Sequence, residues 1–459
     1  MNTYVKKPVN ERCPSERYQD IIRREGGPVH DVLALQSNPP HDDRDIPFER
    51  YTSRDFFELE MQKMWRRVWQ YACRLEHLRE VGDYYVYDIG RFSILITRTE
   101  EGLKAFHNSC LHRGTKLKPS NTFGWSGSIQ CPFHGWEWNL NGTMKSLPCQ
   151  WDFTHFNKDS DDARLKEVRV DTWNGFVFIN MDHDGPGLLE YLEVLPEHFK
   201  DWDMSDWYVC THVQKELPGN WKLAQEAFME AYHTPFAHPE MTHVVSDINM
   251  QHDVFSPHVS RDLCAMASPS PTSPLQQTEQ ELLDKMLMAD RSSVEKTIVP
   301  EGKTARWVMA KQLRENMLQQ YGLDYSSYTD AEMLDSIKYN IFPNLFIYAG
   351  VGLRLIQQFR PLGHDQDRAI FDQIVFKPKP RDGSDYEVAE PYRIGEDDSY
   401  TTVPGLDPFL ASVLDQDTNI MRWQREGMYA SEKGAATLSR YQESRIRHVH
   451  ETLDSYLEK

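Results

Sequence analysis

The chain has 459 residues, 39% of them hydrophobic and 12% aromatic, which is enough to fill the cores of two domains. Its formal net charge is −19, so neither nucleic acid nor an anionic membrane surface is an expected partner. The sequence has no long uncharged apolar stretch and no apolar signal region near its start, so we expect no membrane span and no secretion. Seven cysteines are few for this length, which is typical of the reducing cytoplasm.

The N-terminal part predicts a small all-β domain between residues 45 and 180. Residues 1–44 are polar, contain GGP and NPPHDD, and predict an arm with little regular structure that joins the C-terminal domain. A helical apolar pattern over 53–73 leads into short β-rich runs separated by glycines and charged turns. The strongest runs are DYYVYDIG (83–90), FSILITR (92–98), LKAFHNSC (103–110) and NGFVFINMD (174–182).

Residues 181–459 predict a second domain of the α+β class. WKLAQEAFMEAYH (221–233) has a strong helical pattern, and the mostly polar residues 255–335 predict a partly helical insertion. Further segments predict an antiparallel meander followed by long C-terminal helices. These segments are 340–350, 353–363 and 368–378 for the strands, and 418–431 and 438–459 for the helices.

Two Cys–His pairs stand close together in the sequence: Cys110 with His112, and Cys131 with His134. A structural zinc site is one interpretation, although such sites usually take like ligands in pairs from one knuckle or one helical turn. Pairs that each mix a thiolate with an imidazole suit a [2Fe–2S] centre, in which one iron has two thiolates and the other has two imidazoles. The spacing therefore favours a Rieske-type cluster and leaves zinc as the alternative.

The segment NWKLAQEAFMEAYHTPFAH (220–238) predicts a second metal site. Glu230 and His233 are three residues apart and would share one face of a helix. Pro235 disfavours the helical conformation in the residue before it, so the helix should end or kink there and let His238 turn back toward His233. Two imidazoles and a carboxylate with open positions form the facial triad of non-haem Fe(II) oxygenases. The alternative is that both histidines are ordinary residues at a helix end.

Together these motifs resemble the Rieske non-haem iron oxygenase family, catalytic (alpha) subunit, of the aromatic-ring-hydroxylating dioxygenase type. The resemblance rests on Cys-x-His-x18-Cys-x2-His, with HRG and CPFHGW at the two pairs, and on NWK…E…E-x-YH-x4-H. Rieske proteins of respiratory complexes carry an extra cysteine in each loop, but the matching residues here are Thr115 and Phe133. The resemblance implies a Rieske [2Fe–2S] domain held by the two Cys–His pairs, and a helix-grip (START-like) catalytic domain with a mononuclear non-haem Fe(II).

The resemblance also implies which residues bind the mononuclear iron. These would be His233, His238 and a carboxylate near the C-terminus, where VLDQDTNIMRWQREG offers Asp415 and Asp417. Asp417 fits the register of the family better. It could instead serve only as the N-cap of a helix that starts near Thr418, and capping would still leave one carboxylate oxygen free.

Glu230 would be the catalytic acid that bridges the cluster and the iron, because a carboxylate can accept an N–H from a histidine on each side. The family usually has Asp at this position, and Glu resembles a subset that includes some monooxygenases and quaternary-amine oxidisers. Ring-hydroxylating dioxygenases often carry Asn where this chain has Ala227. Both differences weaken the expectation that the product is an arene cis-dihydrodiol.

The implied function is a terminal oxygenase that uses O2 and electrons from NAD(P)H, delivered by a separate reductase with or without a ferredoxin. No G-x-G-x-x-G follows a predicted strand, so the reductase is expected to be another protein. The implied assembly is a homotrimer, with or without a small β subunit, and the implied substrate is a small apolar molecule, as in aromatic hydrocarbon catabolism. Three alternatives stay open: a monooxygenase or demethylase of a quaternary amine, a pure Rieske electron carrier, and a zinc-stapled binding protein.

Overall fold

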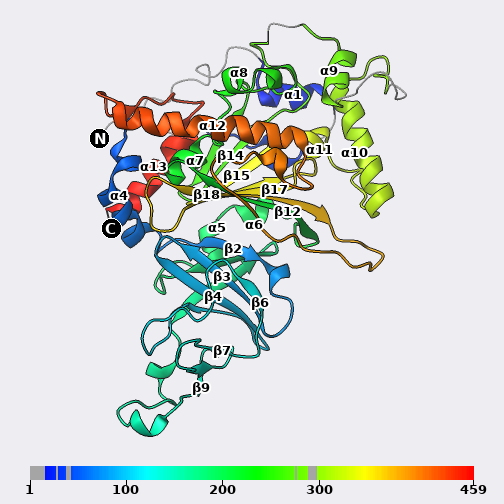
Figure 1. The fold of residues 1–459 in the computed structure, drawn as a ribbon. Coiled ribbons are helices and arrows are strands. Elements are labelled where there is room, and N and C mark those ends of the chain that lie inside the picture. The colour runs from blue at the N-terminus through cyan, green and yellow to red at the C-terminus, as the bar shows by residue number, and fades with distance from the viewer. Residues whose placement is uncertain (1–15, 27–28, 38–42, 274–275, 288–296, 459) are drawn as a thin grey trace.

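The structure is a computed structural model that describes residues 16–26, 29–37, 43–273, 276–287 and 297–458. An all-β domain and a larger C-terminal domain lie end to end along one long axis (Figure 1). Both the all-β character of the first domain and the α+β class of the second agree with the sequence prediction. Among the described residues, no helix has the length and apolarity that crossing a bilayer requires.

The β domain is built on a seven-stranded antiparallel sheet in the order β2-β11-β10-β5-β4-β3-β6, with a small sheet β7-β8-β9 at its outer end. Strand β11 is buried at every position, and its Phe176 packs edge-on against Phe376 of the C-terminal domain. The four predicted strand runs correspond to β3, β4, β5 and β11. The strands are β2 Gln70–Arg74, β3 Asp83–Ile89, β4 Phe92–Thr99, β5 Gly102–His107, β6 Phe123–Trp125, β7 Ile129–Gln130, β8 Glu137–Trp138, β9 Met144–Ser146, β10 Glu167–Trp173 and β11 Phe176–Asn180.

The C-terminal domain contains an eight-stranded sheet in the order β13-β14-β15-β16-β17-β18-β12-β19, in which only the β12–β19 pair is parallel. One face of the sheet meets the β domain, where Gln358 Nε2 donates to the carbonyl of Tyr71 at 2.7 Å. Helices cover the other face (Figure 1), so β17 is buried at all its positions. The strands are β12 Trp207–Leu217, β13 Gln251–Ser256, β14 Val259–Cys264, β15 Ser336–Ile341, β16 Leu345–Ala349, β17 Leu355–Pro361, β18 Ala369–Pro378 and β19 Tyr392–Ile394.

Two long helices near the C-terminus, α12 (Pro408–Ala430) and α13 (Ser444–Leu457), agree with the prediction. Helix α12 starts earlier than predicted because Asp407 caps it, accepting from the N–H of Leu410 at 2.9 Å, and Pro408 suits its first turn. The shorter α-helices of the core are α5 Leu188–Leu192, α6 Leu195–His198, α7 Trp221–Glu226 and α8 Thr234–Ala237, and the 3-10 turns are Leu75–His77, Gln150–Asp152, Asp161–Ala163, Pro239–His243 and Tyr400–Thr402.

Residues 46–64 pair with strand and helix residues of the C-terminal domain, and Glu58 also forms an ion pair of 3.8 Å with Arg91 of the β domain. Strand β1 (Ile46–Pro47) pairs with β20 (Ala435–Ala436), and α3 (Glu49–Thr52) leads into α4 (Arg54–Leu59). The π-helical turn that continues α4 carries Glu60, which forms a fully buried ion pair with Lys222 at 2.7 Å. We therefore propose that the Rieske domain begins near β2 rather than at residue 45. A buried ion pair between distant segments leaves no signal in local sequence.

The N-terminal arm is more regular than predicted in its described part, where α1 (Tyr18–Arg24) and α2 (Asp31–Ala34) form. A contact with the C-terminal domain stabilises these short helices: the Tyr18 hydroxyl donates to the buried carboxylate of Asp335 at 3.0 Å. This contact attaches the described part of the arm to the C-terminal domain.

We likewise propose that the insertion begins after β14 rather than at residue 255, because β13 and β14 belong to the sheet. The sequence does not predict these strands as core strands because they contain charged residues: Arg261 and Asp253 are both buried in an ion pair of 2.7 Å. The inserted helices, which follow β14, are α9 Glu279–Met286, α10 Ala305–Tyr321 and α11 Asp330–Leu334.

Candidate metal centres

The two Cys–His loops of the β domain have the same backbone geometry. In each loop the N–H of the cysteine donates to the carbonyl five residues on, at 2.8 Å for both Cys110 and Cys131. The N–H of the glycine four residues on donates back to the cysteine carbonyl, at 2.9 Å from Gly114 and 3.1 Å from Gly135. Both glycines have φ +74°, which other residues rarely adopt. The loops therefore form a pseudo-symmetric pair that presents one sulfur and one imidazole each.

The two imidazoles converge on one point. His112 Nδ1 and His134 Nδ1 lie 3.2 Å apart, and the ring of His112 stacks on the buried ring of Trp136 at 5.0 Å. Two nitrogens bound to one tetrahedral metal ion at about 2.0–2.1 Å stand about 3.3 Å apart. The observed separation therefore fits two ligands of the same iron.

The two sulfurs lie on the inner side of this site. Cys110 and Cys131 are buried free cysteines, whereas His134 is exposed. Burial raises the pKa of the Cys110 thiol, while the backbone N–H groups of His112 and Arg113 act on its sulfur and lower it. Amides directed at a sulfur stabilise negative charge there, as an iron–sulfur cluster requires. The donor set and its backbone support fit a Rieske cluster with its histidine side toward solvent.

The helix that leads to the second site is shorter than predicted. Helix α7 ends at Glu226, not at residue 233, because buried cations take the next carbonyls. Lys338 donates through Nζ to the carbonyl of Phe228, and Arg445 donates through Nη1 to that of Met229 at 3.1 Å. A helix across this segment would need those carbonyls for its own hydrogen bonds.

Pro235 starts a helix here instead of ending one. It lies in the first turn of α8, where its missing N–H costs nothing, and Thr234 before it is helical. His233 immediately precedes α8 and His238 follows it, so a single helical turn brings the two rings to a centroid separation of 5.3 Å. The predicted approach of the two histidines is thus observed, by a different backbone route.

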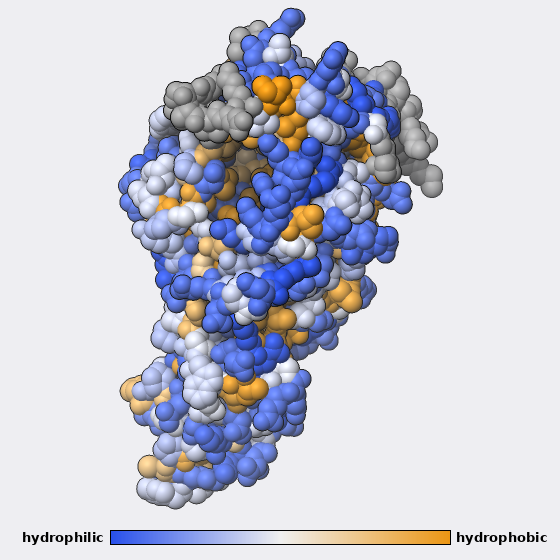
Figure 2. Space-filling model, turned by 90° about the vertical axis from the view of Figure 1, so that its right-hand side faces the viewer, coloured by the Kyte–Doolittle hydropathy of each residue, from blue (hydrophilic) through white to orange (hydrophobic). Residues whose placement is uncertain are grey.

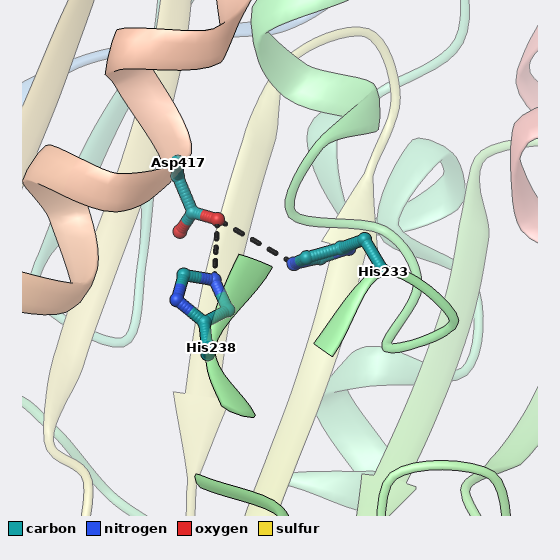
Figure 3. Close-up of side chains that lie close together, drawn as sticks. All are labelled: His233, His238 and Asp417. Atoms are coloured by element: carbon teal, nitrogen blue, oxygen red, sulfur yellow. Dashed lines mark hydrogen bonds and ion pairs between the residues drawn. The ribbon is translucent and has the colours of Figure 1, made fainter. Parts of the chain in front are cut away.

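His233, His238 and Asp417 converge from two distant segments (Figure 3). Asp417 Oδ1 lies 2.7 Å from His238 Nε2 and 3.4 Å from His233 Nε2. One donor atom from each residue lies within 4.8 Å of the others, and two of the three residues are buried. Two imidazole nitrogens and one carboxylate oxygen on a common point are the donor set of a facial triad, so these residues fit a mononuclear Fe(II).

Each triad histidine also makes a hydrogen bond through Nδ1, the ring nitrogen that does not face Asp417. His233 Nδ1 lies 2.6 Å from Glu230 Oε1, and His233 N donates to Glu230 Oε2 at 3.0 Å. His238 Nδ1 lies 2.6 Å from Gln416 Oε1, and Gln416 Nε2 donates to Glu240 at 2.9 Å. An acceptor at Nδ1 keeps the proton there and leaves Nε2 free to bind metal. Glu230 therefore lies where it can position His233.

Gln416 was not singled out from the sequence. Adjacent residues on a helix point in different directions, so spacing gives no indication that Gln416 and Asp417 contact the same ring from both sides. The only signal was its position beside a candidate ligand.

Asp415, the other candidate carboxylate, faces away from the histidines. It accepts from the Ser399 hydroxyl and from the N–H of Tyr400 at 3.0 Å, and lies 3.8 Å from Lys215 Nζ. The geometry therefore favours Asp417 as the ligand. Asp417 lies in the middle of α12, so its possible role as an N-cap is wrong.

The charges of the triad are strongly coupled. Burial lowers the pKa of His233, but hydrogen bonds to Asp417 and Glu230 outweigh burial and raise it to about 10. Burial acts to raise the pKa of Asp417, and its two histidine partners reverse the effect and lower it. A metal ion must displace the proton on His233 Nε2, so metal binding here weakens as pH falls.

Comparison with known proteins gives the family. Residues 197–459 match the ring hydroxylating alpha subunit (catalytic domain), and residues 68–157 match the Rieske [2Fe-2S] domain. The chain therefore belongs to the ring-hydroxylating alpha subunit family. The two matches are a Rieske [2Fe-2S] domain and the catalytic domain of a ring-hydroxylating alpha subunit, which are the two domains that the resemblance predicted.

Individual relatives differ in chemistry. The glycine betaine monooxygenase oxygenase subunit of Pseudomonas aeruginosa UCBPP-PA14 is 29% identical over 219 residues, 47% of this chain and 49% of the relative. The chlorobenzene dioxygenase subunit alpha of Cupriavidus sp. PS12 is 31% identical over 189 residues, 40% of this chain and 42% of the relative. The chain thus spans about half the length of the curated relatives it matches.

Solved structures confirm the fold. The quaternary ammonium Rieske monooxygenase CntA in complex with L-carnitine superposes with a TM-score of 0.61 at 17% identity, covering 90% of this chain and 95% of that one.

Proposed function

We propose that the chain is the terminal oxygenase of a multicomponent system. It would receive electrons from NAD(P)H through a separate reductase, with or without a ferredoxin, and use O2 to oxidise a small organic molecule. The family match, the paired Cys–His loops and the converging triad support this proposal. The complete triad argues against a chain that only carries electrons, and the Rieske match argues against a zinc-stapled binding protein.

The proposal assigns a role to each candidate residue of the two metal sites. Cys110, His112, Cys131 and His134 hold the cluster, and His233, His238 and Asp417 hold the iron, which when bound supplies open positions for O2 activation beside the substrate. Glu230 keeps the proton of His233 on Nδ1, and its carboxylate would also accept from a cluster histidine of the neighbouring copy, which would link the two sites.

A row of hydrogen-bonded polar side chains on the sheet face beneath α12 gives the strongest indication of the substrate class. Tyr348 donates to Gln357 at 3.1 Å, and Gln357 donates to Gln373 at 2.9 Å. Gln373 Nε2 and the Tyr400 hydroxyl at the end of this row are buried without a partner. Burial raises the pKa of both Tyr348 and Tyr400, and the charge of Asp417 adds to the effect, so the row lies near the triad.

Two unpaired donors beside the triad suit a substrate with an oxygen acceptor, because a buried donor left unpaired costs free energy. A hydrocarbon offers no acceptor. We therefore favour a polar amine substrate of the betaine type over the apolar aromatic substrate that the sequence suggested, in line with the relatives that act on glycine betaine and L-carnitine. An arene stays the second candidate, because Phe228, Phe359 and Phe371 pack together on the same face and a chlorobenzene dioxygenase is among the relatives.

We also propose that the chain works as a homotrimer. The β7–β9 end of the Rieske domain and the α8–α12 region lie at opposite ends of one chain (Figure 1). Large side chains are exposed at both, including Phe133 at 59% and Phe236 at 90%. On the face in Figure 2, hydrophobic residues gather in both the upper and the lower part. Head-to-tail contact between copies would bring one chain's cluster to the next chain's iron and cover these patches.

The test is substrate-dependent oxidation of the pre-reduced holoenzyme in a single turnover with O2. Glycine betaine, L-carnitine and choline should each be compared with chlorobenzene. We expect fast cluster oxidation and a hydroxylated or demethylated product with an amine, and a weakened KM for that amine in Gln373→Leu. Oxidation stimulated by chlorobenzene alone would contradict the amine assignment and leave the oxygenase assignment intact.

A further inference from the structure

A polar cavity of about 30 Å³ lies between the two domains, on the sheet face opposite to the triad. The β domain lines it with His77 and Tyr85, and the C-terminal sheet lines it with Arg360, Asp372 and Arg393. A volume of about 10–15 Å³ is enough for one water, so this space could hold a molecule of a few heavy atoms.

Among the described residues that line the cavity, Asp372 has the only carboxylate, and both of its oxygens already accept hydrogen bonds. Asp372 Oδ1 accepts from His212 Nε2 at 2.8 Å and from Gln214 Nε2 at 2.9 Å, and Oδ2 accepts from Arg360 Nη2 at 2.8 Å. Burial would raise the pKa of Asp372, but Arg360 and His212 hold it well below its usual range. Asp372 is therefore a fully engaged anion that neutralises one of the two guanidinium groups.

Both arginines keep a free donor. Arg360 is 6% exposed, its Nη1 donates to the carbonyl of Asp88 at 2.9 Å, and its Nε is buried without a partner. Arg393, at the exposed side, donates through Nε to Gln214 and through Nη2 to the carbonyl of Asn121, both at 3.1 Å. No hydrogen bond to the described residues uses its Nη1. The lining therefore has surplus donors and one net positive charge, but no free carboxylate.

From this imbalance we infer that the cavity is a binding site for a small carboxylate or oxyanion, of the size of formate or bicarbonate. Such an anion would accept from Arg360 Nε and from Arg393 Nη1, which satisfies the buried donor and neutralises the second guanidinium. Because its walls come from both domains, the bound anion would stabilise the docking of the Rieske domain on the catalytic sheet. The site is distinct from the triad, which lies beyond the other face of the sheet.

The experiment measures thermal unfolding of the holoenzyme, followed by the visible absorbance of the cluster, while formate replaces chloride at constant ionic strength. We expect a saturable rise of the Tm, about 1 °C at five times the Kd. Arg393→Gln should abolish the rise. Arg381→Gln, an exposed arginine outside the cavity with the same charge change, should keep it. Benzoate is too large for the cavity and should have no saturable effect.

Three results would overturn the inference: no saturable rise in the wild type, an equal rise in Arg393→Gln, or an equal rise with benzoate. A crystal structure of the holoenzyme grown in formate gives an independent outcome. Density for the anion between Arg360 and Arg393 supports the site, and ordered water alone in that position contradicts it.

Discussion

The two metal sites of this chain are built in opposite ways. The four proposed cluster ligands lie within residues 110–134, in two loops whose own backbone hydrogen bonds shape them. The triad instead joins His238 to Asp417, 179 residues apart, and depends on the packing of α12 over the catalytic sheet. The cluster site should therefore tolerate damage elsewhere in the fold, whereas the triad should respond to changes in the side chains behind its ligands.

The largest loss of metal and absorbance is expected at the cluster site, whose ligands lie close together in the sequence. Cys110→Ser removes one thiolate, and the remaining ligands cannot hold both irons, so the visible Rieske absorbance should vanish and iron per chain should fall from about three to about one. Metal analysis and absorbance spectra check this. Cys149→Ser, an exposed cysteine outside the loops, is the control. If Cys110→Ser kept the full Rieske spectrum, Cys110 would not be a ligand of the cluster.

The distant site is tested by Asp417→Ala against Asp415→Ala. Asp417→Ala should lose substrate oxidation and the mononuclear iron, while its cluster spectrum survives. Asp415→Ala should keep iron and most activity, because its carboxylate contacts Ser399 and Tyr400 instead of the histidines. Iron content and turnover are measured for both. The reverse pattern would mean that α12 presents the other carboxylate to the metal.

Glu230→Gln addresses the link between the two sites. The amide keeps the size of the side chain but removes the charge held at His233 Nδ1. We expect normal metal content and electron transfer from cluster to iron slowed at least about 10–100-fold, measured in a single turnover with substrate and O2. Glu432→Gln removes the charge of an exposed glutamate outside the site and should transfer electrons normally. Equal rates in Glu230→Gln and wild type would exclude Glu230 from this step.

A smaller effect is expected at Gln416, which holds His238 from behind. Gln416→Leu removes the acceptor at Nδ1 and should weaken iron binding about 10–100-fold. Gln416→Glu keeps an acceptor and should bind iron at least as tightly as the wild type. Competition with a chelator measures the affinity, independently of turnover. If both variants bind iron like the wild type, the 2.6 Å contact does not position the ligand.

The contrast between local and distant contacts also explains which features could be predicted from the sequence alone. The Cys–His pairs, strands β3, β4, β5, β11, β17 and β18, and the C-terminal helices could be predicted, because local spacing and alternation determine them. The end of α7 at Glu226 was not, since buried Lys338 and Arg445 decide it from distant strands and helices. The attachment of residues 46–64 likewise depends on the buried ion pair of Glu60 with Lys222. The family register already favoured Asp417 over Asp415, but the contact of Gln416 with His238 required the placement of α12.

The central claim is that the two sites act as one unit only between copies of the chain, and mixing two inactive variants tests it most directly. Asp417→Ala keeps a cluster but no catalytic iron, and Cys110→Ser keeps the iron but no cluster. Randomly mixed trimers would pair an intact cluster with an intact iron at about a quarter of their interfaces, so about a quarter of wild-type activity should return. If mixed oligomers form and stay as inactive as either parent, electrons do not cross between subunits, and the account is contradicted.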